Sequence, residues 1–275
     1  MSKLETNKKK ILENKYQFKT NYTGDLEEFK KNLMEKKIIP HQVEFQAPPR
    51  GKKICWLECP YCYGLSADDT KERLEKERGL EILKQILSGG VKKIIFAGYA
   101  TDPLNCSYIE ELLDMTISKK AIFGFNTKAI RVSEDFLSIL QNGNIIEGSY
   151  ISLSIDAGSN ETYNKIHAVK SKANIYDKVQ QNVKQSRKLR IKKNFDLSAA
   201  YLVNINSSNT YDYEKFTNDF IEAGCNLLRF TFPQQPKDIK TDKGVIPSVE
   251  DVKKYKKELE KIKNKYSNSN CSILV

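Results

Sequence analysis

Cys55, Cys59 and Cys62 lie within the short segment CWLECPYC. Gaps of three and then two residues can bring three thiolates around one small centre on a single tight loop. A fourth cysteine would complete the ligand set of a [4Fe–4S] cluster and give an electron carrier, whereas three leave one iron open for chemistry. The spacing therefore favours an iron–sulfur cluster with one open iron.

Structural zinc is the alternative for three close cysteines, and it usually takes four ligands from two separated pairs. The chain has two histidines, His41 and His167, and three other cysteines that are scattered singly, Cys106, Cys225 and Cys271. No second pair exists, so these three cysteines are expected to bind no metal, although one of them could complete a zinc site. A zinc-stabilised, non-catalytic binding protein thus stays the second interpretation.

Composition narrows the classes of partner. The net charge is +11 over 275 residues, but the lysines are spread among glutamates and aspartates, as on a solvated helix face. Clustered arginines with aromatic residues would indicate a nucleic-acid partner, but the chain shows only one modest basic patch, 184–193. We therefore expect no nucleic-acid partner. No run approaches the ~20 apolar residues of a membrane span, and the chain starts MSKLE without an apolar signal segment. We expect a cytoplasmic protein without disulfides.

Short β-rich runs alternate with helical runs, which predicts a parallel sheet with crossover helices. The expected strands are 41–46, 94–98, 121–126, 150–155, 195–203 and 226–230, and the first crossover helix starts near Thr70. Six units give a partial (β/α)6 TIM-type barrel of the α/β class, since a complete barrel has eight. Residues 271–275 resemble a seventh strand cut short. A helical extension, 1–40, is expected ahead of the barrel, 41–275.

The cysteine segment and the strand order together resemble the radical S-adenosylmethionine (radical SAM) superfamily. Its signature is this cysteine spacing with an aromatic residue before the last cysteine, here Tyr61. The resemblance covers about 43–231 and implies a [4Fe–4S] cluster on the cysteine loop after the first strand, together with S-adenosylmethionine (SAM). One electron from the cluster would cleave SAM to a 5′-deoxyadenosyl radical, which abstracts hydrogen from a substrate.

The resemblance also implies SAM-binding positions on the loops that follow the strands. Tyr61 matches a residue whose backbone contacts the adenine. Gly98 and Asp102 lie in AGYATDP, where the family carries Gly-Gly-Glu-Pro, so Asp102 is the expected partner of the SAM ammonium. Asn126 ends the third strand, as in the family's Thr-Asn-Gly strand end. Asp and Asn at such positions are also typical of ordinary turns.

The fourth strand offers further contacts. Period-two geometry places Ser152, Ser154 and Asp156 on one face of a buried strand, where polar side chains need partners. The resemblance implies Ser154 against the SAM carboxylate or ribose, with Asp156 following it. His167 is expected to be a helix-end histidine in a charge–dipole interaction rather than a catalytic base. Residues 201–204 are expected near the adenine or the substrate.

The sequence indicates less about the substrate than about the cofactors. A six-unit barrel is laterally open and can admit an extended chain, and residues 1–40 could dock a leader peptide by strand addition. The segments CPYCY and SIDA also resemble peptide-modifying members of the superfamily. We expect a peptide or protein substrate, with a small metabolite or RNA as the alternative, and a flavodoxin- or ferredoxin-type reductant. A C-terminal auxiliary-cluster domain is either absent or lies on a longer protein.

Overall fold

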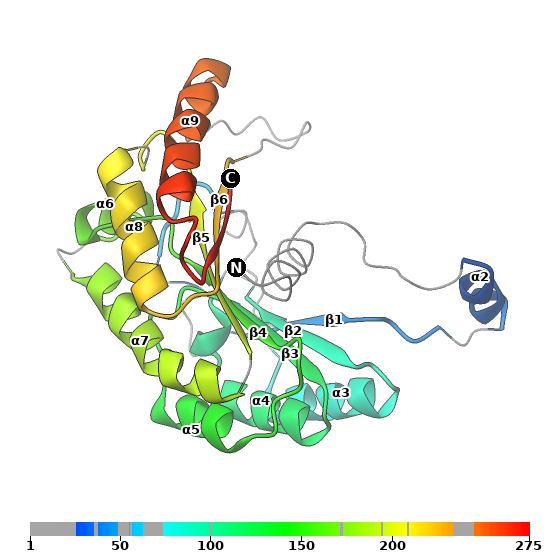
Figure 1. Ribbon diagram of the computed structural model, residues 1–275. Coiled ribbons are helices and arrows are strands. Elements are labelled where there is room, and N and C mark those ends of the chain that lie inside the picture. Colours follow the sequence, from blue (N-terminus) through cyan, green and yellow to red (C-terminus); the bar gives the residue numbers. More distant parts are fainter. Residues whose placement is uncertain are drawn as a thin grey trace.

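The protein forms one parallel sheet with helices packed outside it (Figure 1). The computed structural model describes residues 26–35, 38–48, 55, 57–62, 74–98, 101–170, 173–193, 195–207, 209–233 and 245–275. Seven strands lie side by side in the order of the sequence, and every neighbouring pair is parallel. They are β1 (Val43–Gln46), β2 (Lys93–Ala97), β3 (Ile122–Thr127), β4 (Tyr150–Ser154), β5 (Asp196–Leu202), β6 (Leu227–Thr231) and β7 (Ser272–Leu274).

The sheet is an open barrel. In the part of the chain that the structure describes, β1 pairs only with β2 and β7 pairs only with β6. The predicted partial TIM-type barrel is therefore confirmed, and the short seventh strand lies where 271–275 was expected. Because parallel strands end at the same edge, the loops after β1 to β5 meet at one rim.

Helices follow the strands in the predicted alternation. They are α2 (Leu26–Met34), α3 (Lys76–Ser88), the 3-10 turn η2 (Pro103–Asn105), α4 (Ile109–Ser118), α5 (Glu134–Asn142), α6 (Asn160–Ile166), α7 (Ile175–Lys193), α8 (Thr210–Glu222) and α9 (Val249–Lys265). Figure 1 shows α2 apart from the barrel, so it is the described part of the predicted helical extension. The expected start of the first crossover helix near Thr70 lies outside the described residues; within them, Glu75 is extended, with ψ 156°, and α3 begins at Lys76.

The two faces of the sheet differ in chemistry. Aromatic side chains cover the outer face: the Phe96 and Phe125 rings stack at 4.9 Å, and Phe125 meets Phe136 of α5 at 5.2 Å. The inner face carries Gly124, at which a Cβ atom would lie 2.4 Å from the Tyr150 ring. Burying each large apolar side chain under the helices contributes about 1.5–3 kcal/mol, so the outer face holds the barrel together. The inner face is left for polar groups.

None of the described helices is both long and apolar enough to cross a lipid bilayer.

Candidate functional site

The three predicted cysteines lie together on one loop. Cys59 is buried, Cys55 and Cys62 are half-buried, and all three are free thiols. The Cys62 N–H donates to the Cys59 carbonyl at 3.0 Å, which closes a tight turn. Burial raises the pKa of Cys55 and raises the pKa of Cys59 to about 11. Thiols in such a place ionise readily only against added positive charge, such as a metal centre.

The cysteine loop rests on the end of α6. The Glu58 N–H donates to the His167 carbonyl at 3.1 Å, and Cys59 Sγ lies 3.1 Å from His167 Nδ1. Tyr61 Oη lies 3.0 Å from the same Nδ1. On its other side, His167 Nε2 lies 3.2 Å from the Ile155 carbonyl, which only an N–H can satisfy. The helix that follows β4 therefore fixes the position of the loop.

Burial lowers the pKa of His167 to about 3, and the nearby Lys128 ammonium acts in the same direction. The imidazole is therefore neutral at physiological pH, with its proton on Nε2 and a free lone pair on Nδ1 for a thiol or phenol to donate to. The expected satisfied histidine at a helix end is confirmed, since His167 is the C-cap of α6, but its neutral ring makes no charge–dipole interaction. His167 is a satisfied buried histidine that holds the cysteine loop.

Asp156 connects three separate elements. Its Oδ1 accepts from the Leu202 N–H at 2.8 Å, and its Oδ2 accepts from Tyr61 Oη at 3.0 Å and from Lys128 Nζ at 3.3 Å. Burial acts to raise the pKa of Asp156, but the Lys128 ammonium and the hydrogen bonds outweigh it, so the pKa is lowered. Its φ of 63° is one that aspartate tolerates better than most residues. Asp156 thus ties β4 to β5 and to the cysteine loop.

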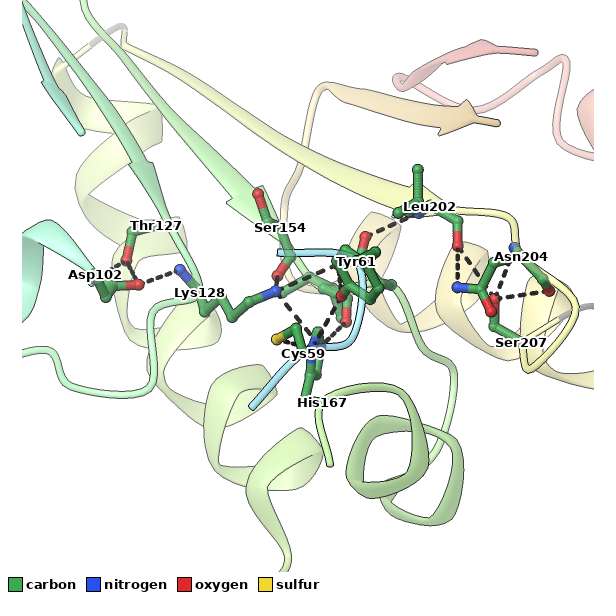
Figure 2. A network of polar contacts seen from close by, with 12 residues as sticks. Cys59, Tyr61, Asp102, Thr127, Lys128, Ser154, His167, Leu202, Asn204 and Ser207 are labelled. Carbon is green, nitrogen blue, oxygen red and sulfur yellow. Dashed lines mark hydrogen bonds and ion pairs between the residues drawn. The ribbon is translucent and has the colours of Figure 1, made fainter. Parts of the chain in front are cut away.

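Lys128 was missed by the sequence reasoning, although it directly follows the third strand. Figure 2 shows its side chain reaching toward His167 while its backbone nitrogen faces Asp102. Its Nζ pairs with Asp156 Oδ2 at 3.3 Å. Its Nζ also donates to the Ser154 carbonyl at 3.1 Å. The ion pair with Asp156 is largely buried, at 18% and 6% side-chain exposure. A cation therefore lies beside the thiols. The position of Lys128 at the end of a strand is the sequence feature that could have identified it.

Asp102 joins the loop after β2 to the end of β3. Its carboxylate accepts from the Thr127 hydroxyl at 2.8 Å, from the Lys128 N–H at 2.6 Å and from the Leu104 N–H at 2.9 Å. Burial raises the pKa of Asp102 despite these donors. A carboxylate offers about four lone-pair positions, so three donors leave room for one more.

Gly98 is required by packing. A Cβ atom there would lie 2.0 Å from the Thr101 carbonyl oxygen, because the loop folds back onto the end of β2. The Thr101 hydroxyl is buried and has no hydrogen-bond partner among the residues that the structure describes. The loop thus brings backbone and one unsatisfied hydroxyl to the same rim as Asp102.

Asn126 and Ser154 lie at the rim on neighbouring strands. Asn126 is exposed and aligned with Ser152 of β4, whereas Ile151 and Leu153 face the outer helices beside Phe136. Period-two alternation places Asn126, Ser152 and Ser154 on the inner face. The hydroxyl of Ser154 points away from Lys128 in Figure 2, while its carbonyl points toward it. These side chains are free to face a bound molecule inside the barrel.

One expected contact on β5 is misplaced. The Tyr201 ring packs outward against Tyr213 and Phe216 of α8, at 5.4 and 5.2 Å, and its hydroxyl donates to the Ser207 carbonyl. Tyr201 therefore belongs to the outer core, and the inner positions of β5 are those of Ser198 and Ala200.

The donor set fits a cluster. A cubane cluster takes its three protein ligands on three different irons, and three free thiols on one tight loop match that requirement. In addition, the fully buried Tyr163 hydroxyl beside the loop has no hydrogen-bond partner within the described residues, so a group that binds there could satisfy it.

A comparison with family models matches residues 52–216 to the Radical SAM superfamily. Among curated proteins, an S-adenosylmethionine-dependent nucleotide dehydratase of Flammeovirga pacifica is 33% identical over 121 residues, which are 41% of this chain and 38% of that protein. The match thus covers well under two thirds of the relative's length.

Two solved structures share the fold. SuiB of Streptococcus suis gives a TM-score of 0.63 at 15% identity, covering 98% of this chain and 60% of SuiB. It has also been solved with the precursor peptide SuiA and with S-adenosylmethionine. The enzyme anSMEcpe, solved with AdoMet and the Cp18Cys peptide, gives 0.58 at 17% identity and covers 85% of this chain and 63% of that one. Identities this low show the fold alone.

Proposed function

Because the chain belongs to the radical SAM superfamily, whose members use a [4Fe–4S] cluster and SAM, we propose that Cys55, Cys59 and Cys62 each ligate one iron of such a cluster. The observation that carries the proposal is the turn of three free thiols at the rim, packed on His167 and beside the Lys128 ammonium. The bound cluster supplies the electron that cleaves SAM to a 5′-deoxyadenosyl radical. The chain's own residues position these groups and exclude water.

For SAM we propose four contacts at the rim. The fourth acceptor position of Asp102 takes the ammonium, and the backbone that Gly98 exposes lies beside it. Asn126 and Ser154 face the carboxylate and ribose from the inner face. Supporting this assignment, these residues come from three successive strand ends, which meet at one rim of the sheet.

Tyr61 and Asp156 act differently in this proposal. Their side chains bond to each other at 3.0 Å, which fixes the last turn of the cysteine loop and leaves the Tyr61 backbone to meet the adenine. Asp156 also neutralises the Lys128 ammonium, so its carboxylate holds the rim residues in position and does not bind SAM. Sequence reasoning had both residues at the cofactor but assigned Asp156 no such connecting role.

The proposed substrate is a peptide or protein side chain or Cα. Two observations support it. The sheet is open between β1 and β7, so an extended chain can reach the inner face from the side. Two structural neighbours have been solved with a peptide bound. The alternative is a nucleotide or another small metabolite, which the dehydratase relative favours.

We further propose a flavodoxin- or ferredoxin-type protein as the electron donor. A hollow of about 440 Å³ lies directly beside the cysteine loop and is lined by Leu57, Glu58, Lys170 and Lys178 among others. Lys170 is 82% exposed although it pairs with Glu58 at 2.9 Å. An acidic donor docked over this hollow would be separated from the cluster by little more than the loop itself.

Anaerobic reconstitution tests the reaction. The wild-type chain should bind about four irons, turn brown and, once reduced, convert SAM to methionine and 5′-deoxyadenosine. Cys59→Ala should lose the cluster, whereas the matched control Cys106→Ala, a buried cysteine between η2 and α4, should keep it. Stoichiometric zinc without iron after strictly anaerobic isolation would overturn the proposal in favour of a zinc-stabilised binding protein.

Deuterium transfer tests the substrate. Deuterated candidate peptides and a panel of deuterated nucleoside triphosphates are incubated separately with the reduced enzyme and SAM. Label should appear in 5′-deoxyadenosine from a peptide. Label from a nucleotide, with none from any peptide, would replace the peptide proposal with the nucleotide alternative.

A further inference from the structure

Tyr163 lies one helical turn before His167, on the same face of α6. The two rings meet edge to face with centroids 4.2 Å apart, and His167 in turn touches Cys59. The Glu58 N–H bonds the His167 carbonyl, so this face of α6 is joined to the cysteine loop through both backbone and side chain. Tyr163 thus belongs to the helix face on which the cysteine loop rests.

The hydroxyl of Tyr163 is unusual for a buried group. Its side chain is fully buried, yet the hydroxyl makes no hydrogen bond within the described residues. Most buried polar groups have a partner, and one left alone incurs the full desolvation penalty. Burial raises the pKa of Tyr163, and interactions with Asp156, Cys59, Asp102 and Cys55 act in the same direction. The hydroxyl is therefore a neutral donor, on a ring that packs against the His167 ring beside Cys59.

The carboxylates near this hydroxyl already have donors, since Asp156 and Asp102 each accept hydrogen bonds from three other groups of the chain. The sulfur atoms of Cys59 and Cys55 lie in the same environment, and they become strong acceptors when they are thiolates. Thiolates form there when the cysteines ligate iron.

We propose that the Tyr163 hydroxyl donates a hydrogen bond to a sulfur of the bound cluster, on the Cys59 side, and thereby makes the cluster easier to reduce. The inference rests on the proposed ligation by Cys55, Cys59 and Cys62. A donor at a cluster sulfur stabilises the more negative, reduced form more than the oxidised form, so it raises the reduction potential. Tyr163 is a positioning and tuning residue and does not contact the substrate.

The test uses Tyr163→Phe, which removes only the oxygen. Tyr213→Phe is the matched control, because Tyr213 is also fully buried with an unpartnered hydroxyl, but its surroundings are Tyr255, Glu258 and Asp212 on the α8–α9 side. Both variants are reconstituted without SAM or substrate, titrated with titanium(III) citrate and followed by EPR. Tyr163→Phe should hold the wild-type iron content, show a more negative midpoint potential and have altered g-values. Tyr213→Phe should match the wild type.

A second readout separates a direct hydrogen bond from a general packing effect. In D₂O, pulsed ENDOR of the reduced wild type should detect an exchangeable deuteron at the cluster that Tyr163→Phe lacks. If the Phe variant takes up no cluster, 3-fluorotyrosine at position 163 serves instead, and its stronger donor should move the potential in the positive direction.

An unchanged potential and an unchanged deuteron coupling would overturn the inference, as would a fluorotyrosine variant with the wild-type potential. Either result leaves the ligation by the three cysteines standing, because the cluster is then present. A wild-type chain that binds no iron would overturn the ligation and the inference together.

Discussion

Lys128 and Asp156 form a buried ion pair, in which each charge compensates the other. Removing one partner of such a pair leaves an uncompensated charge and is strongly destabilising. Asp156 would keep the Leu202 N–H and the Tyr61 hydroxyl as donors, but it would lose the ammonium that most lowers its pKa. The pair therefore affects the folding of the rim as well as its charge.

Lys128→Met should destabilise the folded chain by about 3 kcal/mol at pH 7, measured by urea unfolding of the iron-free protein. Lys215→Met, which breaks a more exposed pair with Asp219 on α8, should have a smaller effect. In the double variant Lys128→Met with Asp156→Asn, much of the loss should be recovered. Equal effects of Lys128→Met and Lys215→Met would mean that the pair at the rim is solvated.

The same pair predicts a pH dependence with a defined sign. The folded pKa of Asp156 is lowered, so its charge contributes stability above the unfolded value of about 3.9, and this contribution is lost as the pH falls through the folded pKa. In Lys128→Met the main cause of the lowering is gone. The difference in unfolding free energy between variant and wild type should therefore shrink as the pH is lowered from 7 toward about 3. A difference that is constant over this range would contradict the assignment.

Asp102→Asn tests the ammonium contact without emptying the site, since asparagine keeps an acceptor for the Lys128 N–H. Loss of the negative charge should weaken SAM binding about tenfold or more, because a hydrogen bond to a charged group contributes about 1.5–3 kcal/mol. Iron content should stay at the wild-type level. Asp251→Asn on α9 is the control, and isothermal titration with SAM is the measurement. Wild-type affinity in Asp102→Asn would mean that the ammonium binds elsewhere.

At the scale of elements, the strand order was predictable because each buried strand before β7 is followed by a helical run. Ser133 caps α5 by accepting from the Phe136 N–H, as its position before the helix indicates. The start of α3 was not predictable from a capping residue, since its N-cap, Glu75, makes no side-chain capping hydrogen bond. Tyr201 shows a second limit: a strand's period says which residues share a face, but not which face is outside.

The site was predictable in part for a similar reason. The cysteines, Asp102 and Asp156 follow strands, so the topology alone brings them to one rim. The approach of Tyr163 to the loop depends on how the end of α6 packs against Cys59 through His167. No spacing within the sequence encodes that packing.

The loop after β2 gives a prediction at this scale. Gly98→Ala would place a Cβ atom 2.0 Å from the Thr101 carbonyl, so the loop must shift and move Asp102. The change should destabilise the chain by about 1–3 kcal/mol and also weaken SAM binding. Gly89→Ala at the end of α3, where the nearest atom lies at 3.2 Å, should have little effect on SAM binding. A Gly98→Ala variant with the SAM affinity of the wild type would show that the loop adapts without moving Asp102.

At the scale of the whole molecule, the proposed partners would bind at different places. In the proposal, SAM and the substrate bind at the inner face and at the side between β1 and β7, whereas the hollow beside Leu57 and Lys170 lies where α6 and α7 meet the cysteine loop. An electron donor and a substrate could therefore bind at the same time. The net charge of +11 would steer an acidic donor toward the molecule, and the local lysines would select the hollow.

Charge reversal of the hollow tests this division. The double variant Lys170→Glu with Lys178→Glu should be reduced several-fold more slowly by a flavodoxin, because charges at the edge of a docking interface act mainly on the association rate. Reduction by dithionite, a small reagent that needs no docking surface, should be unchanged. The wild-type rate with flavodoxin should fall with added salt more steeply than that of the variant. The control reverses Lys253 and Lys257 on α9, which are exposed and equally basic but lie away from the loop. If both double variants slow flavodoxin equally, the donor responds to net charge alone and the hollow is not its docking site.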